Sequence, residues 1–259
     1  MTDRKVLFVL EGNKAEPRLL KKSYQLMLSI KPQNIFRYGA DVHQLIRSMF
    51  PGGEPDENLD LLAVLREKSD SPVLSQEYAQ VFLVFDMDPQ DGEYDPVMMR
   101  KALEYFDNPT ENGKLYINYP MVESYRHLVS ESFDDYRDLS VTFSDIKHYK
   151  NYVNTYGLKE LRQPRMVDSR VIRSLIVFNL RKLNFALTGD DEMPDSDGCR
   201  SLDLTRFFDI QSLMLKEEGC ILVMNTFLIS IVDYNPVRFL EDLNLEDGNR
   251  LPIRHSESN

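Results

Sequence analysis

The sequence predicts an α/β fold with a parallel sheet in its first half and a mainly helical second half. Two short apolar runs, Val6–Leu10 and Val81–Phe85, contain no polar residue, which is typical of strands buried on both faces of a parallel sheet. Segments with helical spacing alternate with strand candidates up to about residue 130. This alternation favours parallel strands joined by right-handed crossover helices.

The elements of this first part follow one another in a regular order. Gly12 permits a sharp turn after the first strand, and Pro17 is tolerated in the first turn of a helix over Ala15–Met27. The other expected strands are Ile35–Tyr38 and Leu115–Tyr119. The other expected helices are Asp41–Met49, Asn58–Lys68, Val97–Phe106 and Met121–Val129.

Helical periodicity dominates beyond residue 130. Expected helices there are Ile146–Tyr156, Asp168–Leu187, Leu204–Glu217 and Pro236–Leu243. Cys220–Val232 fits either a buried helix or a strand, and the polar end Glu246–Asn259 is expected to fray. We therefore expect two domains, residues 1–130 and residues 131–259.

The composition predicts a cytoplasmic protein that does not enter a membrane. Cys199 and Cys220 are the only two cysteines among 259 residues, too few for a disulfide framework and without zinc-ligand spacing. The first residues lack the pattern of a signal peptide. The apolar stretch Cys220–Val232 is shorter than the roughly 20 residues that a membrane span needs.

Charge is distributed unevenly along the chain. The total is -11, yet residues 146–182 contain nine basic and two acidic residues, a local balance of +7. Such asymmetry predicts a polyanion site, and three tyrosines (Tyr149, Tyr152 and Tyr156) in this region could stack on bases. The alternatives are a solvated helical face or a basic surface that pairs with the acidic half. The candidate nucleic-acid-binding residues are Lys147, Lys150, Arg162, Arg165, Arg170 and Arg173.

Carboxylates follow three of the expected strands. Glu11 comes directly after the first strand, Asp86 and Asp88 after Val81–Phe85, and Glu123 shortly after Leu115–Tyr119. If these strands are neighbours, their carboxyl ends share one edge of the sheet and the four side chains converge. Mg²⁺, or Mn²⁺, would relieve their mutual repulsion, because hard divalent cations prefer oxygen ligands. The alternative is that the aspartates only cap turns and helices.

This order of motifs resembles the TOPRIM superfamily, the catalytic fold of topoisomerases, primases and several nucleases. The segment FVLEGNKAEP is similar to the first motif of RloB-like bacterial proteins, in which a strand leads into Glu-Gly and a second glutamate-containing turn, here Glu16-Pro17. Asn118–Tyr125 is similar to the third motif of that group, but departs from it at Tyr119, Val122 and Tyr125. The resemblance covers about residues 5–130.

The resemblance implies Mg²⁺- or Mn²⁺-dependent cleavage of phosphodiesters in DNA or RNA, including tRNA, in bacterial anti-phage defence. In that scheme Asp86 and Asp88 hold the metal and Glu123 completes or positions its shell. Glu11 acts as a ligand at a second metal site or as a general acid or base. Lys147 or Lys150 could stabilise the transition state. A partner ATPase or regulatory protein would control the activity.

Other classes of function remain open from the sequence. A TOPRIM-like module could bind nucleic acid or a partner without turnover. A strand ending in Asp-x-Asp also begins the haloacid-dehalogenase phosphatases, although there the motif lies near the N-terminus and Pro89 does not fit it. An Asp-x-Asp site of a nucleotide-sugar glycosyltransferase has no other support in the chain.

Overall fold

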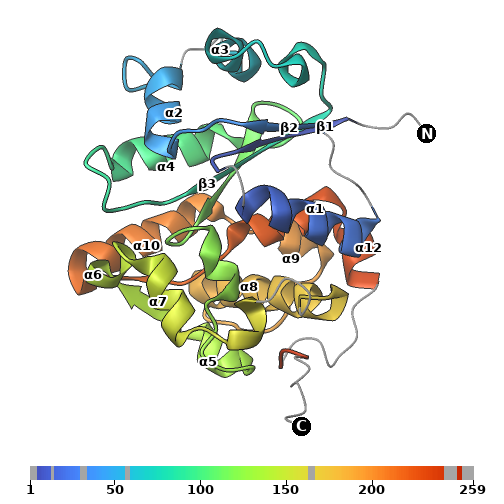
Figure 1. Cartoon of the computed structure of the whole chain (residues 1–259), viewed down its shortest axis with the longest axis vertical. Coiled ribbons are helices and arrows are strands. Elements are labelled where there is room, and N and C mark those ends of the chain that lie inside the picture. Colours follow the sequence, from blue (N-terminus) through green and yellow to red (C-terminus); the bar gives the residue numbers. More distant parts are fainter. Residues whose placement is uncertain are drawn as a thin grey trace.

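A five-stranded sheet forms the centre of the molecule (Figure 1), and its strand order is β2-β1-β3-β5-β4. The computed structural model describes residues 5–12, 15–29, 34–55, 59–162, 167–241 and 250–252. Three adjacent strands are parallel, namely β1 (Val6–Leu10), β3 (Gln80–Asp86) and β5 (Gly113–Asn118). At the edges, β2 (Asn34–Arg37) is parallel and β4 (Asp107–Asn108) antiparallel. The predicted α/β fold with a mostly parallel sheet is confirmed.

Helices and a small second sheet account for most of the remaining described residues. The antiparallel pair β6 (Ser140–Thr142) and β7 (Cys220–Leu222) forms the second sheet. The α-helices are α1 (Ala15–Leu28), α2 (Val42–Met49), α3 (Leu61–Lys68), α4 (Pro96–Tyr105), α5 (Phe133–Arg137), α6 (Phe143–Ile146), α7 (Tyr149–Tyr156), α8 (Ser169–Thr188), α9 (Ser196–Arg200), α10 (Leu204–Glu218), α11 (Ser230–Tyr234) and α12 (Pro236–Glu241). The 3₁₀ helices are η1 (Pro72–Ser75), η2 (Val122–Arg126), η3 (Lys159–Arg162) and η5 (Thr226–Ile229).

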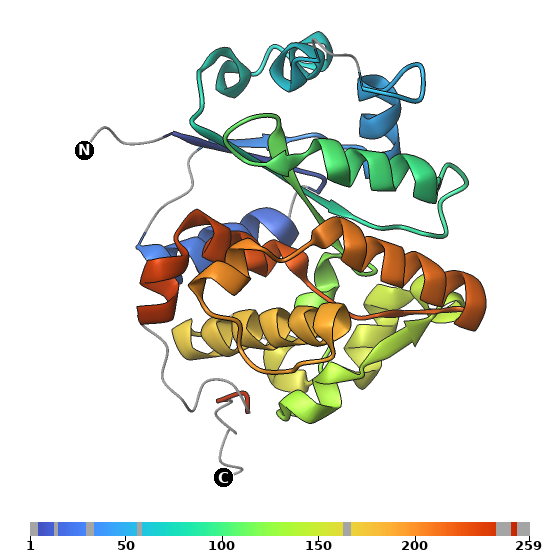
Figure 2. The same ribbon diagram turned by 180° about the vertical axis from the view of Figure 1, so that it is seen from behind.

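The two faces of the large sheet are covered differently. Helices α2, α3 and α4 lie on one side, whereas α1 and the helices of the second half lie on the other (Figures 1 and 2). On the second side Phe8 of β1 packs against Tyr24 of α1, with ring centroids 5.0 Å apart, and stacks on Phe82 of β3 at 5.5 Å. Aromatic packing of this kind fixes α1 on the sheet.

The second half of the chain packs directly against the sheet through residues 220–234. The backbones of Tyr119 and Met224 exchange two hydrogen bonds of 2.8 and 2.9 Å. The Thr226 hydroxyl donates to the backbone oxygen of Ile117 at 2.7 Å. Both halves therefore contribute to one hydrophobic core, and the division into domains at residue 130 stays a prediction.

Three expected elements differ from the structure. Met121–Val129 was expected to be an α-helix, but the segment contains the shorter η2, because the Asn225 side chain donates to the Val122 carbonyl that an α-helix would bond internally. The expected helix Ile146–Tyr156 is divided into α6 and α7 around His148. Cys220–Val232 contains both types of structure, a strand followed by η5 and the start of α11.

The expected helix Asn58–Lys68 begins at Leu61 and is capped by Asp60, and Asn58 lies outside the described residues. Of the C-terminal end Glu246–Asn259, only residues 250–252 are described. Within the described residues, no helix has both the length and the apolar character that a membrane crossing requires.

Asn225 is expected to secure the second half of the chain to η2. Its buried side chain donates to the Val122 carbonyl at 3.1 Å and to the Ser124 hydroxyl at 3.3 Å. Asn225→Ala should lower the free energy of unfolding by about 1–3 kcal/mol, because buried polar partners lose their hydrogen bonds. Urea denaturation measures the loss. Asn151→Ala, on the exposed face of α7, is the matched control, and equal stability of the two variants would contradict the assigned role.

Candidate functional site

Three neighbouring strands bring the predicted carboxylates to one edge of the sheet. Leu10 of β1 is in register with Val84 of β3, so Glu11 lies beside the end of that strand. Asp86 is the last residue of β3 and is in register with Asn118, the last residue of β5. The carboxyl ends of parallel strands are where ligands bind in open α/β sheets. The three strands are therefore neighbours in the sheet, as expected.

Glu11 and Asp86 contact one another at this edge. The Asp86 backbone N–H donates to Glu11 Oε2 at 2.9 Å, which connects the ends of β1 and β3. The Asn118 amide donates to Asp86 Oδ1 at 3.2 Å, which connects β3 to β5. Asp86 and Asn118 are both buried. These two hydrogen bonds hold the Asp86 carboxylate between the two neighbouring strands.

Helix capping does not explain Asp86 or Asp88. Asp41, Asp95 and Asp168 show how this chain uses aspartate as a cap, since each accepts hydrogen bonds from backbone N–H groups at the start of a helix. Neither Asp86 nor Asp88 accepts such a bond from a described backbone N–H; their oxygens accept from side-chain amides instead. Helix capping, the alternative from the sequence, is therefore not seen at either residue among the described backbone groups.

Asp88 has an unusual backbone conformation. Its φ angle is +41°, in the left-handed region that residues with a side chain adopt at a cost, and such outliers occur most often at functional sites. Burial raises the pKa of its carboxyl, while the nearby His43 and Lys150 lower it. His43 of α2 is 4% exposed, and its Nε2 has no hydrogen-bond partner among the described residues. Sequence reasoning missed this histidine, because nothing in its helix distinguishes it.

Glu16 is a further carboxylate of the cluster. It lies in the first turn of α1 and is buried, with 6% of its surface exposed. A Cβ atom at Gly12 would lie 2.5 Å from both Glu16 carboxylate oxygens, so the glycine leaves room for this carboxylate. Burial raises the pKa of Glu16, and the charge of Glu123 raises it further. The sequence motif contains Glu16, but its spacing from Glu11 did not indicate that it turns back towards the site.

Glu123 connects the cluster to a basic residue of the second half. Its carboxylate, on η2, is buried, and Oε1 lies 3.7 Å from Nζ of Lys150 on α7. The other oxygen, Oε2, is buried without a hydrogen-bond partner in the described part of the chain. An unsatisfied buried carboxylate oxygen is costly. A cation at this place would satisfy it.

We call five carboxylates the cluster, namely Glu11, Glu16, Asp86, Asp88 and Glu123. Burial disfavours the ionised form of its innermost members. Burial, and then the charges of Asp88 and Glu16, raise the pKa of Glu11 to about 8, against the opposing hydrogen bond from Asp86. Burial and the charge of Glu11 raise the pKa of Asp86 well above its usual value. Ionisation of Glu11 and Asp86 together is therefore unfavourable unless a cation compensates their charge.

The donor chemistry fits Mg²⁺ or Mn²⁺. Carboxylate oxygens are the preferred ligands of both ions, and Mg²⁺ often takes only one or two of them together with water and substrate oxygens. Within the described residues, no three His, Cys, Asp or Glu side chains are spaced to ligate a single ion directly.

The predicted nucleic-acid-binding residues have different surroundings. Lys150 lies at the cluster, and Lys147 is exposed at the end of α6. Arg162 is half-buried and donates to the backbone oxygen of Gly157 at 3.0 Å. Two of the predicted residues lie in α8, namely the exposed Arg170, 3.6 Å from Asp168, and the half-buried Arg173. Arg165 lies outside the described residues.

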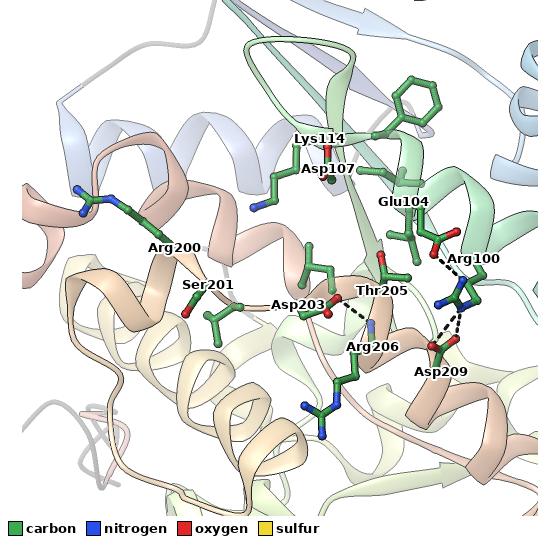
Figure 3. Close-up of a pocket in the computed structure, with 15 residues that line it drawn as sticks. Arg100, Glu104, Asp107, Lys114, Arg200, Ser201, Asp203, Thr205, Arg206 and Asp209 are labelled. Atoms are coloured by element: carbon green, nitrogen blue, oxygen red, sulfur yellow. Dashed lines mark hydrogen bonds and ion pairs between the residues drawn. The ribbon is translucent and has the colours of Figure 1, made fainter. Parts of the chain in front are cut away.

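A cavity of about 670 Å³ lies away from the cluster (Figure 3). Asp107 and Lys114, near the start of β5, line one side, and the first residues of α10 line the other. The basic and acidic side chains that line it are equal in number, and Arg100 bonds Glu104 and Asp209. The cavity therefore has no excess of either charge and is not part of the carboxylate site.

The raised pKa of Glu11 makes the stability of the metal-free protein depend on pH. The folded protein keeps this proton up to about pH 8 and the unfolded chain only up to 4.5, so stability falls as the pH rises between these values. Glu11→Gln stays neutral, so it should lose less stability than the parent between about pH 5 and pH 8. At about pH 8 it should be more stable by at least about 1 kcal/mol. Urea denaturation in EDTA measures both, with Glu104→Gln as an exposed control; equal pH slopes for parent and Glu11→Gln would contradict the prediction.

Comparisons with protein-family models, with curated proteins and with solved structures find no match to this chain. The residues and their geometry therefore carry the functional argument.

Proposed function

We propose that the protein is a metal-dependent nuclease of the TOPRIM type that hydrolyses phosphodiester bonds in DNA or RNA. One observation carries the proposal: Glu11 and Asp86 lie together at the carboxyl ends of parallel strands, where the charges of Asp88 and Glu16 act on both of them. Glu123 adds an unsatisfied buried oxygen with a lysine beside it. Anti-phage defence, control by a partner ATPase or regulatory protein, and a cytoplasmic location follow from the resemblance and the composition, and they stay predictions.

Asp86 and Asp88 would hold Mg²⁺ or Mn²⁺, and Glu123 would complete or position the shell of the ion. When bound, the ion neutralises charge on the phosphate and makes water a stronger nucleophile. Asn118 fixes Asp86 through the 3.2 Å hydrogen bond, so that its second oxygen remains available. Gly12 leaves space for Glu16, which adds negative charge to the same place.

Glu11 is suited to move a proton. Its pKa of about 8 lies close to neutral pH, where general acid–base catalysis is most efficient. The hydrogen bond from the Asp86 backbone N–H fixes its carboxylate at the strand end. It can therefore take a proton from the attacking water or give one to the leaving oxygen.

Lys150 forms an ion pair with one carboxylate of the cluster. Its side chain is largely exposed, and its ammonium group contacts the Glu123 carboxylate at 3.7 Å. It also lowers the pKa values of Glu16 and Asp88, although it is only a lesser cause for each. An ammonium group at this position can bind a phosphate oxygen and stabilise charge that develops in the transition state.

Cleavage of nucleic acid should depend on the cluster and on the metal. The parent should cut single- or double-stranded DNA, bulk RNA or tRNA in Mg²⁺ or Mn²⁺, and EDTA should abolish the cutting. Asp86→Asn and Glu11→Gln should each reduce the rate by at least about 100-fold, since each removes a group that acts on the reacting atoms. Gel assays with labelled substrates measure the rates, and Glu104→Gln, outside the cluster, should keep the parent rate.

The cleavage assay also distinguishes the nuclease from the other candidate functions. Cleavage that persists in both cluster variants would overturn the proposal. Binding of nucleic acid without metal-dependent cutting would favour a non-catalytic module. Hydrolysis of p-nitrophenyl phosphate, with nucleic acids left intact, would favour a phosphatase.

Metal binding should stabilise the folded protein. Millimolar Mg²⁺ or Mn²⁺ should raise the melting temperature by about 5 °C or more, because the ion binds the folded state and relieves the repulsion between carboxylates. Differential scanning fluorimetry measures the shift. In Asp86→Asn the shift should be smaller. A parent protein whose melting temperature does not respond to either metal would contradict a metal site.

A further inference from the structure

Helix α7 extends from the carboxylate cluster to an aromatic pair whose second ring, Tyr156, is exposed. Lys150, in its first turn, contacts Glu123 at 3.7 Å. Tyr156 is the last residue of the helix and is 60% exposed. Six residues of α-helix correspond to about 9 Å along the axis, roughly the length of three stacked nucleotides at 3.4 Å each. Nucleic acid with a phosphate at the cluster therefore reaches Tyr156 within a few nucleotides.

The aromatic pair consists of Tyr152 and Tyr156, one helical turn apart, with ring centroids 4.6 Å apart. Tyr152 also packs against the His127 ring at 5.4 Å. His127 is buried and forms a 2.9 Å hydrogen bond with the Tyr149 hydroxyl, so it is a fixed structural support. Tyr149 is 1% exposed and belongs to the core. Of the three tyrosines of α7, Tyr156 therefore presents the most exposed ring, and it is supported from behind.

Two guanidinium groups border this end of the helix. Arg126 of η2 donates to the Asn154 side chain at 2.8 Å, and Arg162 of η3 donates to the backbone oxygen of Gly157 at 3.0 Å. Neither forms an ion pair with a carboxylate in the described part of the chain, whereas Arg100 and Arg137 do. Their positive charge is thus available to a polyanion that passes Tyr156.

We propose that Tyr156, backed by Tyr152, stacks on an unpaired base of the substrate while a phosphate of the same strand lies at the carboxylate cluster. The inference rests on the proposed function and specifies its substrate class: single-stranded nucleic acid, or an unpaired loop or end. In a duplex, both faces of each internal base are already stacked on neighbouring bases, so Tyr156 finds no free base. An aromatic ring beside positive charge is the usual platform for single strands.

The chain contains no tryptophan, so Tyr156→Trp places a single fluorescent reporter in the subsite. The variant is titrated in EDTA with mixed-sequence single-stranded DNA and RNA of about twelve nucleotides and with the matching duplexes. Stacking on a base should reduce the indole emission by about half or more with a single strand, and duplexes should have little effect. Leu213→Trp, on the exposed surface of α10 and 54% exposed, is the matched control and should not respond.

Binding measured by fluorescence anisotropy of labelled oligonucleotides completes the test. Tyr156→Ala should bind a single strand about tenfold more weakly, and Tyr156→Phe should bind like the parent. Unchanged circular dichroism and melting temperature show that these exposed substitutions leave the fold intact. Oligonucleotide binding without quenching in Tyr156→Trp, or equal quenching by duplexes, would overturn the inference.

The two proposals fail in different ways. Metal-dependent cleavage by the parent, with no effect of Tyr156→Ala on single-strand binding, overturns the stacking subsite alone. Quenching and weaker binding without any cleavage support the subsite and overturn the nuclease. Glu123→Gln distinguishes the nuclease from the stacking subsite. It should reduce cleavage, whereas quenching should persist when it is combined with Tyr156→Trp.

Discussion

The hydrogen bond between the Asp86 backbone and the Glu11 carboxylate holds together charges that repel one another. Five carboxylates meet at one end of the sheet, and such groups would separate if their backbones could move. They cannot, because the stacked rings of Phe8 and Phe82 and the helices on both faces fix the strands. The apolar core thus offsets an electrostatic cost at the edge, and the proposed cation would relieve that repulsion.

The parallel sheet could be predicted because its strands are encoded locally. Val6–Leu10 and Val81–Phe85 are apolar throughout, and their structures extend over nearly the same residues. Once these strands are parallel neighbours, the positions of Glu11 and Asp86 at a common edge follow from topology. Such local patterns therefore contain enough information to bring these two carboxylates together.

Features that depend on distant contacts could not be predicted in the same way. η2 is short because Asn225, about 100 residues later, binds its carbonyl. His43 approaches Asp88 through the packing of α2, which its helical pattern does not reveal. Glu16 belongs to the cluster because α1 begins immediately beside Gly12. In each case, part of the site depends on a contact with another segment, and the sequence pattern of that segment does not indicate the contact.

The late position of residues 220–234 in the chain affects when the site is completed during synthesis. All five carboxylates lie in the first half of the chain, but the Thr226 contact that fastens this segment to β5 joins residues 109 positions apart. During synthesis on the ribosome, the five carboxylates are therefore added to the chain long before the residues that hold η2 and Glu123 in place. For an enzyme of the proposed kind, made beside messenger and transfer RNA, this delay separates synthesis from activity, since contacts between distant residues form last.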